Sequence, residues 1–211
     1  MKLLILGSTG GTGRELVRQA LRQGHTVTAF ARNTADLCVH HARLSVAEGD
    51  ILEPETLEAA ARGQDAALSA LGVAALGPSS TLSDGTQNVI EVLRWHSIDR
   101  FVCQSAMGVA ESMKQLPALS LLFRTVMYPF VLRNVYADKE LQEYYVRRSK
   151  LDWTLVRPAV LTDGPHTSTY RALRPLETDL QGTISRADVA DFMLAALTDE
   201  TTVGRAISLS Y

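Results

Sequence analysis

The fold is decided by residues 2–13, which read Lys2-Leu3-Leu4-Ile5-Leu6-Gly7-Ser8-Thr9-Gly10-Gly11-Thr12-Gly13. The continuous apolar run at 2–6 predicts a strand that is buried on both faces of a parallel sheet. From 11 to 23, apolar residues recur at intervals of three and four, which predicts a helix that ends at Gly24. The glycines at 7, 10 and 13 therefore lie in the turn between the first strand and the first helix.

The same alternation continues along the chain. Further strands are expected at 25–30, 43–48, 65–71, 100–104, 153–157 and 206–209, and helices at 54–61, 83–96, 137–149 and 185–197. This order predicts an α/β fold in one domain, residues 1–211, with a doubly wound, mainly parallel sheet and helices on both faces. Segments 106–135 and 161–182 fall outside the alternation. Both follow the carboxyl ends of expected strands, where ligands bind, so we expect them on the substrate side.

Composition narrows the range of partners. The formal net charge is −2 and no apolar run reaches the roughly 20 residues of a membrane helix, so neither nucleic acid nor a membrane is expected. No secretory leader is recognisable at the N-terminus, which favours a cytoplasmic protein. Cys38 and Cys103 share no metal-ligand spacing, so we expect two reduced, mostly buried thiols and no metal site.

The glycine turn suits a dinucleotide pyrophosphate. A helix N-terminus offers free N–H groups and the positive end of the helix dipole, and glycines let phosphates approach. At the first strand–helix junction of an alternating chain, this pattern predicts a Rossmann fold and a nicotinamide dinucleotide. The expected contacts are Gly7, Ser8, Thr9, Gly10, Gly11, Thr12 and Gly13. The alternative is a glycine-rich turn without a ligand.

The end of the second strand favours NADPH or NADP+ over NAD. NAD sites carry an acid about 20 residues after the glycines, on the ribose 2′-hydroxyl. This chain has Arg32-Asn33 there, and Asp36 follows only within an expected helix. An arginine can bind a 2′-phosphate through paired hydrogen bonds. A solvated surface arginine is the alternative.

Three later stretches complete a family pattern. They are Gly49-Asp50-Ile51, Leu151-Asp152-Trp153-Thr154-Leu155-Val156-Arg157-Pro158 and Ile184-Ser185-Arg186-Ala187-Asp188-Val189-Ala190. With them, nearly the whole chain resembles the atypical short-chain dehydrogenase/reductase proteins of the NAD(P)H-binding type. That family includes biliverdin-IXβ reductase, also called flavin reductase, and NADP-sensing regulators that do no chemistry.

The resemblance implies further contacts with the cofactor. Asp50 and Ile51 would contact the adenine, and Leu71 and Gly72 would lie along the dinucleotide. Ser105 would face the nicotinamide, which Pro158, Ala159 and Val160 would brace. Simpler alternatives stay open: Asp50 caps the helix that starts near Pro54, Ser105 is a turn residue, and Pro158 only ends a strand.

The catalytic pair of many short-chain dehydrogenases is Tyr-x-x-x-Lys, in which the lysine lowers the tyrosine pKa. Here Tyr136-Ala137-Asp138-Lys139 is one residue too short, and residues three apart are rotated on a helix relative to residues four apart. We therefore expect no tyrosine acid. The candidate catalytic residues are Ser105, Lys139 and His166. Alternatively, Lys139 forms an exposed ion pair with Glu143, and His166 is a surface residue.

A missing tyrosine acid favours acceptors that take hydride into a conjugated system and a proton from solvent. We expect an NADPH-dependent oxidoreductase, flavin reductase-like, acting on a small planar acceptor such as a flavin, quinone or bilin. The alternative is a non-catalytic NADP(H)-binding redox sensor; a sugar-nucleotide epimerase is a third possibility. His166 and Tyr170 are the polar groups expected nearest the acceptor. The apolar stretch 116–135 forms one wall of that pocket, or else core or a subunit interface, in a monomer or homodimer.

Overall fold

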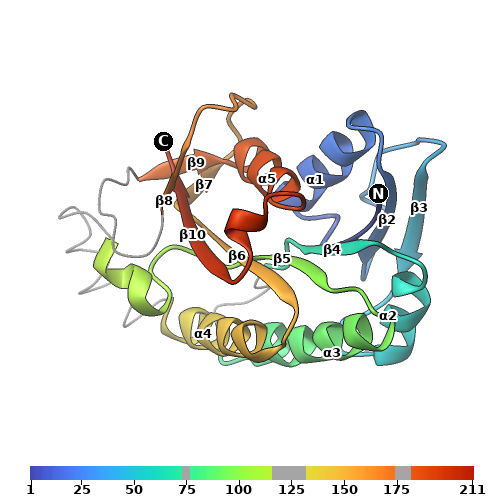
Figure 1. The fold of residues 1–211 in the computed structure, drawn as a ribbon, viewed down its shortest axis with the longest axis horizontal. Helices are drawn as coiled ribbons and strands as arrows, with labels where there is room; N and C mark the ends of the chain where they lie inside the picture. The colour runs from blue at the N-terminus through green and yellow to red at the C-terminus, as the bar shows by residue number, and fades with distance from the viewer. Residues whose placement is uncertain (73–76, 116–131, 174–181) are drawn as a thin grey trace.

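A computed structural model shows how the chain is arranged, and it describes residues 1–72, 77–115, 132–173 and 182–211 (Figure 1). Within these ranges the main sheet has eight strands. In spatial order they are β3 (Leu44–Glu48), β2 (Thr26–Ala31), β1 (Lys2–Leu6), β4 (Ala66–Ser69), β5 (Arg100–Gln104), β6 (Asp152–Pro158), β10 (Arg205–Ser210) and β8 (Arg171–Leu173). Only β8, at one edge, runs antiparallel to its neighbour. The mainly parallel, doubly wound sheet is confirmed.

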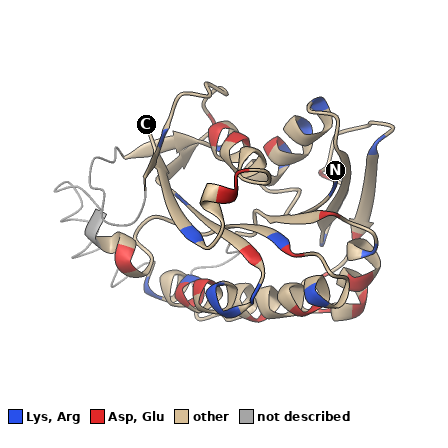
Figure 2. Cartoon of the chain, viewed as in Figure 1, with Lys and Arg blue, Asp and Glu red and all other residues tan. Residues whose placement is uncertain are grey.

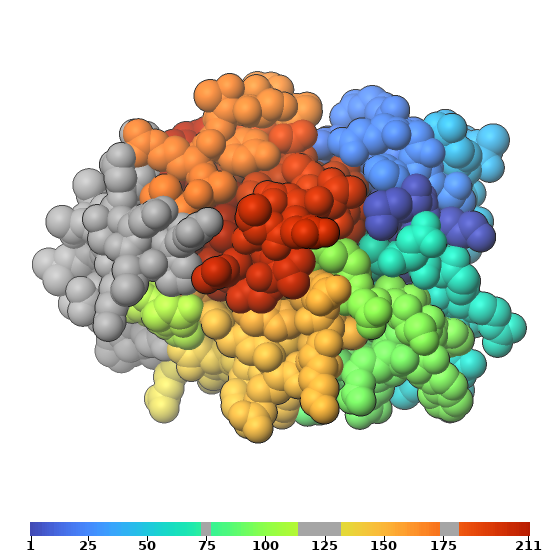
Figure 3. Space-filling model, in the orientation of Figure 1, coloured from blue at the N-terminus to red at the C-terminus, as the bar shows by residue number. Residues whose placement is uncertain are grey.

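The helices cover both faces of the sheet (Figure 1). On one face lie α1 (Gly11–Arg22) and α5 (Arg186–Ala195), and on the other α2 (Pro54–Ala61), α3 (Thr81–Trp95) and α4 (Arg133–Arg148). Short 3-10 helices, η1 (Ala110–Gln115) and η4 (Glu200–Thr202), complete the described helical segments. Figure 3 shows the C-terminal elements, in red, between the blue α1 and the yellow α4.

Two apolar cores explain the sequence of β1. Leu3 and Ile5 belong to the core beneath α1 and α5, whereas Leu4 and Leu6 belong to the core beneath α2, α3 and α4. Side chains of a strand alternate between faces, and both faces are covered here, so every position after Lys2 is apolar. Acidic and basic side chains are interspersed on the helices (Figure 2). None of the helices within the described ranges is long and apolar enough to cross a membrane.

The strand order reverses between β1 and β4. β1 pairs with β2 on one side and with β4 on the other, so the connections that leave these strands move apart. In open α/β sheets a ligand crevice forms at such a point, beyond the carboxyl ends of the strands. The fold thus places the glycine turn after β1 at the crevice.

Several local expectations were wrong. Helix α4 starts at Arg133 rather than at residue 137, and residues 32–43 form no helix, so Asp36 lies in a turn. Segment 161–182 contains β8 and takes part in a small parallel sheet of β7 (Val160–Thr162) and β9 (Thr183–Ser185), strands too short to show a period. Cys38 is exposed, because it lies in the loop after β2, while Cys103 is buried. The stretch expected as an acceptor wall, 116–135, falls largely outside the described residues.

Candidate functional site

A cavity of about 730 Å³ opens at the carboxyl ends of β1, β2 and β4, where the strand order reverses. Among the residues expected to bind cofactor, those that line it are Gly7, Thr9, Gly10, Arg32, Asn33, Asp50, Ile51, Leu71 and Gly72. They come from loops far apart in the sequence. The structure therefore brings together most of the residues that the motifs single out.

The glycine turn is folded tightly against its own backbone. Gly7 has a φ of +74°, in the left-handed region that favours glycine. A Cβ on Gly13 would lie 2.0 Å from the Gly7 carbonyl oxygen, so no side chain fits at Gly13. The Ser8 hydroxyl donates to the Phe30 carbonyl at 3.1 Å and braces the turn from below. The start of α1 is thus open toward the cavity, as an anion site requires.

Arg32 and Asn33 lie at one end of the cavity, together with Asp36. Arg32 and Asp36 are both exposed, so the cavity lining holds a cation and a carboxylate here. The Asn33 side-chain oxygen accepts a hydrogen bond from the Ala35 amide at 3.0 Å, which holds the turn after Arg32. The sequence did not predict Asp36 as a cavity residue, because its pattern favoured a helix at that position.

Asp50 and Ile51 form the neighbouring wall. The Asp50 carboxylate accepts from the Leu52 amide at 2.9 Å, before α2 begins. The alternative that Asp50 caps α2 is wrong, since Glu53 is the N-cap residue. Ile51 packs so closely on Gly85 of α3 that a Cβ there would lie 2.3 Å from its Cδ1. This part of the cavity wall therefore lies between the start of α2 and the side of α3.

Ser105 follows β5, and its buried hydroxyl has no hydrogen-bond partner among the described residues. The Gln104 side-chain oxygen next to it is in the same condition. Buried polar groups are nearly always hydrogen-bonded, so the Ser105 hydroxyl is available to a ligand, although Ser105 is not among the residues that line the cavity. The contact of Ser105 with a nicotinamide stays a prediction.

Lys139, on α4, is buried and makes no ion pair or hydrogen bond within the described parts of the chain. Burial lowers its pKa, although nearby Cys103 and the carboxylates of Glu143 and Asp138 favour the charged form. Burial also raises the pKa of the Cys103 thiol to about 12, so this sulfur stays protonated. Lys139 is therefore a buried amine facing the end of β5.

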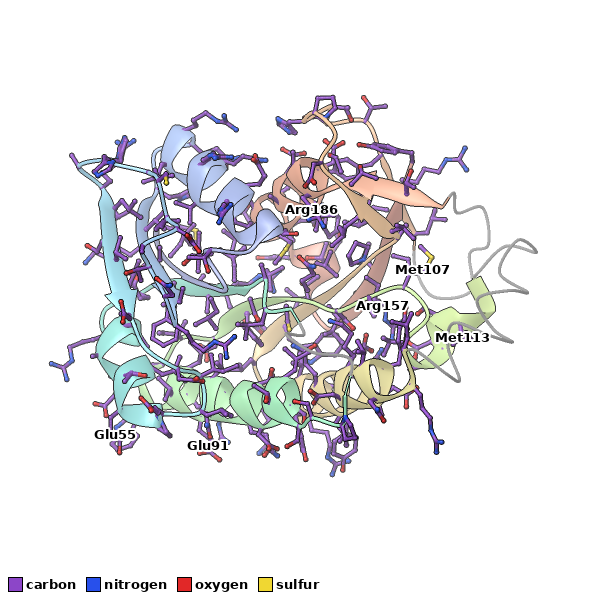
Figure 4. The ribbon with its side chains drawn as sticks, turned by 180° about the vertical axis from the view of Figure 1, so that it is seen from behind. Glu55, Glu91, Met107, Met113, Arg157 and Arg186 are labelled. Atoms are coloured by element: carbon purple, nitrogen blue, oxygen red, sulfur yellow. The ribbon has the colours of Figure 1, made fainter. Side chains whose placement is uncertain are left out.

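Glu143 does not form an exposed pair with Lys139, so that alternative is wrong. Its carboxylate instead accepts two hydrogen bonds from Arg157 of β6, at 2.8 Å from Nε and 2.5 Å from Nη2. Both side chains are buried, and Figure 4 shows Arg157 between the sheet and α4. Arg157 also contacts Glu111 of η1 at 3.1 Å, and Arg147 contacts Glu111 at 2.8 Å. The network ties α4, β6 and η1 together.

Tyr136 is buried, and its hydroxyl donates to the Met107 carbonyl at 2.9 Å. The phenol proton is therefore donated to a backbone carbonyl in this structure. The aromatic residue at the start of the Tyr136–Lys139 stretch thus fastens α4 to the segment that follows β5.

His166 and Tyr170 both contact Asp191 of α5, at 3.1 Å and 2.9 Å. Neither lines the cavity, and α5 lies on the opposite face of the sheet from α4. The structure does not bring His166 together with Lys139, and the catalytic role of His166 stays a prediction. Burial and the Asp191 carboxylate both raise the pKa of Tyr170.

Around the end of β6, the described hydrogen bonds are made by backbone groups. The Pro158 carbonyl accepts from the Met107 amide at 3.0 Å, and the Ala159 amide donates to Leu209 at 2.9 Å. The Val160 side chain is 68% exposed and does not line the cavity. The described contacts hold Pro158 and Ala159 at the carboxyl end of β6, while a nicotinamide contact of these three residues stays a prediction.

Asp138 is a cavity residue that sequence reasoning missed. It is buried, and its carboxylate accepts from the amides of Leu82 and Ser83, in the first turn of α3, at 3.1 and 2.9 Å. A carboxylate on one helix that caps another leaves no trace in local sequence, because the two partners are 55 or more residues apart.

Comparisons with known proteins agree with this site. The chain belongs to the NAD(P)H-binding family, whose profile matches residues 7–200. It is 32% identical over 222 residues to the uncharacterized sugar epimerase YhfK of Bacillus subtilis, covering 100% of this chain and 94% of that protein. The resemblance to atypical short-chain dehydrogenases is confirmed, and with it an NAD(P)H-binding protein of the oxidoreductase class.

Solved structures share the fold. A short-chain dehydrogenase/reductase of Veillonella parvula, in complex with NADP, superposes with a TM-score of 0.84 at 18% identity, covering 100% of this chain and 94% of that one. ChuY of Escherichia coli O157:H7, named an anaerobillin reductase, has a TM-score of 0.78 at 25% identity, covering 100% and 97%. The expected Rossmann fold is confirmed.

Proposed function

We propose that this chain is an NADPH-dependent reductase that transfers hydride to a small planar conjugated acceptor of the flavin, quinone or bilin type. The observation that carries the proposal is the Tyr136 hydroxyl, which is held by the Met107 carbonyl. Reduction of a ketone needs a placed acid, whereas a conjugated acceptor takes hydride and is protonated from solvent. The likeness to ChuY, a reductase by name, supports this class of reaction.

Arg32 supports NADPH as the cofactor. Its side chain lines the end of the cavity that follows β2, at the position where NAD-specific sites carry an acid. A guanidinium there binds a 2′-phosphate through charge-assisted hydrogen bonds. The NADP bound to the Veillonella parvula structure is consistent with this preference.

Bound at this site, the reduced nicotinamide supplies the hydride. Ser105 would donate or accept a hydrogen bond at the nicotinamide end, since its hydroxyl is buried and lacks another partner among the described residues. Lys139 is buried, and its Nζ would lie near that end. These residues orient the donor and acceptor, which is the main requirement of such a transfer.

NADPH oxidation at 340 nm tests the proposal, with FMN, riboflavin, quinones and biliverdin as acceptors and NADH in parallel. We expect saturable turnover with at least one acceptor and a preference for NADPH. NADPH binding without turnover of any acceptor would contradict the enzyme and favour the redox-sensor alternative. If the acceptor binds against the bound cofactor, it should also stabilise the protein against unfolding, but only when the cofactor is present.

A further inference from the structure

Arg186, the first residue of α5, lies directly on the glycine turn. A Cβ on Gly11 would lie 2.4 Å from Arg186 Cδ and 2.7 Å from its Nε. Gly11 is the exposed first residue of α1, so the arginine side chain crosses the helix end that faces the cavity. Figure 4 labels Arg186 beside the start of α1.

The charges around the cavity call for a second cation. Among the described residues that line it, Arg32 is the one cation, whereas Asp36, Asp50 and Asp138 contribute three carboxylates. The amides of α3 that donate to Asp138 carry no net charge, so they do not cancel its carboxylate charge, and all three acids repel an anionic ligand. The described part of the site therefore has too little positive charge for a pyrophosphate unless a residue just outside the lining contributes.

Arg186 is held loosely enough to contribute. Its Nη1 lies 2.6 Å from Asp163 Oδ1, and the Asp163 side chain is 89% exposed. Exposed ion pairs are weak. The contact with Asp163 uses one guanidinium nitrogen, and the planar group offers further N–H donors to a second anion.

From these contacts we infer that Arg186 is a pyrophosphate-binding residue of the dinucleotide site, with Asp163 as its counter-ion. This assignment rests on the cofactor site proposed above and assigns it a second cation. Arg32 then binds the 2′-phosphate end, Arg186 the pyrophosphate, and the amides of α1 lie between them. The exposed glycine at position 11 has a function too: a side chain there would displace the arginine.

Fragments of the cofactor test this division. NADPH and ADP-ribose contain the pyrophosphate, whereas 2′-AMP contains only the 2′-phosphate end. Arg186→Met keeps the aliphatic chain over Gly11 and removes the charge. We expect it to weaken NADPH and ADP-ribose about tenfold, as for a lost charged hydrogen bond, and to change 2′-AMP less than twofold. Arg186→Lys should restore part of the loss.

Two controls make the result decisive. Arg32→Ala should show the reverse pattern, weakening 2′-AMP but not ADP-ribose. Asp163→Asn should leave binding unchanged or tighten it. Equal weakening of all three ligands by Arg186→Met, no weakening of any, or a matching loss in Asp163→Asn would overturn the assignment. If the unaltered protein bound neither NADPH nor the fragments, the cofactor site itself would fail.

Discussion

Glu143 gives both carboxylate oxygens to Arg157 of β6 and none to Lys139, although Lys139 stands one helical turn before it on α4. The paired geometry is the strongest available to an arginine and a carboxylate. Lys139 consequently stays buried without an ion pair among the described residues. The Lys139 amine therefore has the Glu143 and Asp138 carboxylates nearby but forms no direct ion pair with either within the described residues.

Arg157→Met should destabilise the protein by about 3–5 kcal/mol, because it leaves the buried Glu143 carboxylate without its main partner. Urea unfolding followed by circular dichroism measures this. Arg147→Met is the matched control, since Arg147 is 36% exposed and its loss should cost about 1 kcal/mol or less. Equal losses in both variants would contradict the importance of the buried pair.

Glu111 should make stability depend on pH. Burial alone would raise its pKa, but the hydrogen bond from Arg157 and the charges of Arg157 and Arg147 lower it from 4.5 to about 2. Its contribution is therefore complete above pH 4.5 and is lost as the pH falls toward 2. Urea midpoints measured between pH 6 and 2 should decline less steeply in Glu111→Gln than in the unaltered protein. Identical slopes would show that Glu111 does not titrate in this way.

Gly13→Ala should abolish the glycine turn. The new Cβ would lie 2.0 Å from the Gly7 carbonyl oxygen, so the backbone must move. We expect the Kd for NADPH to rise more than tenfold and the unfolding free energy to fall. Gly182→Ala, where nothing lies within 4 Å, is the control and should leave both values nearly unchanged. Normal NADPH affinity in Gly13→Ala would place the cofactor elsewhere.

Arg32→Ala should weaken NADPH by about 1.5–3 kcal/mol and NADH little, since only NADPH carries the 2′-phosphate. Isothermal titration with each cofactor measures the difference. Asp36→Asn should act in the opposite direction and tighten NADPH, because Asp36 lines the same end of the cavity. A similar loss for both cofactors in Arg32→Ala would remove the basis for NADPH preference.

Tyr136→Phe should keep most of the reductase kcat, because the hydroxyl is held by the Met107 carbonyl. Lys139→Met should lower kcat about tenfold, the worth of one charged hydrogen bond to the bound cofactor or acceptor. Steady-state rates with the best acceptor compare the two variants. A larger loss in Tyr136→Phe than in Lys139→Met would restore the tyrosine acid and argue for a carbonyl substrate.

Local sequence was sufficient for the strand–turn–helix unit at 2–24 and for half of the residues that line the cavity. Strands buried on both faces read as unbroken apolar runs, and a motif at a strand end is carried to the crevice by the fold itself. Arg32 and Asp50 lie at the cavity for that reason.

Contacts between elements could not be derived in the same way. The partner of Glu143 depends on which face of β6 meets α4, and spacing on α4 alone favours Lys139. Arg186 likewise reaches Gly11 only because α5 packs beside α1, across most of the chain. The exposure of Cys38 follows from a loop path that apolar neighbours do not reveal.

The reversal of strand order between β1 and β4 also has a cellular consequence. The cavity is shared by two halves of the sheet: Gly7 and Arg32 come from one half, and Leu71 and Asp138 from the other. A chain with only one half folded has no site, so the dinucleotide binds the native state alone. At a hundredfold excess over Kd it adds about 2.7 kcal/mol to stability. The lifetime of the protein in the cell should then increase with the concentration of its cofactor. The cofactor-free protein should unfold and be degraded first.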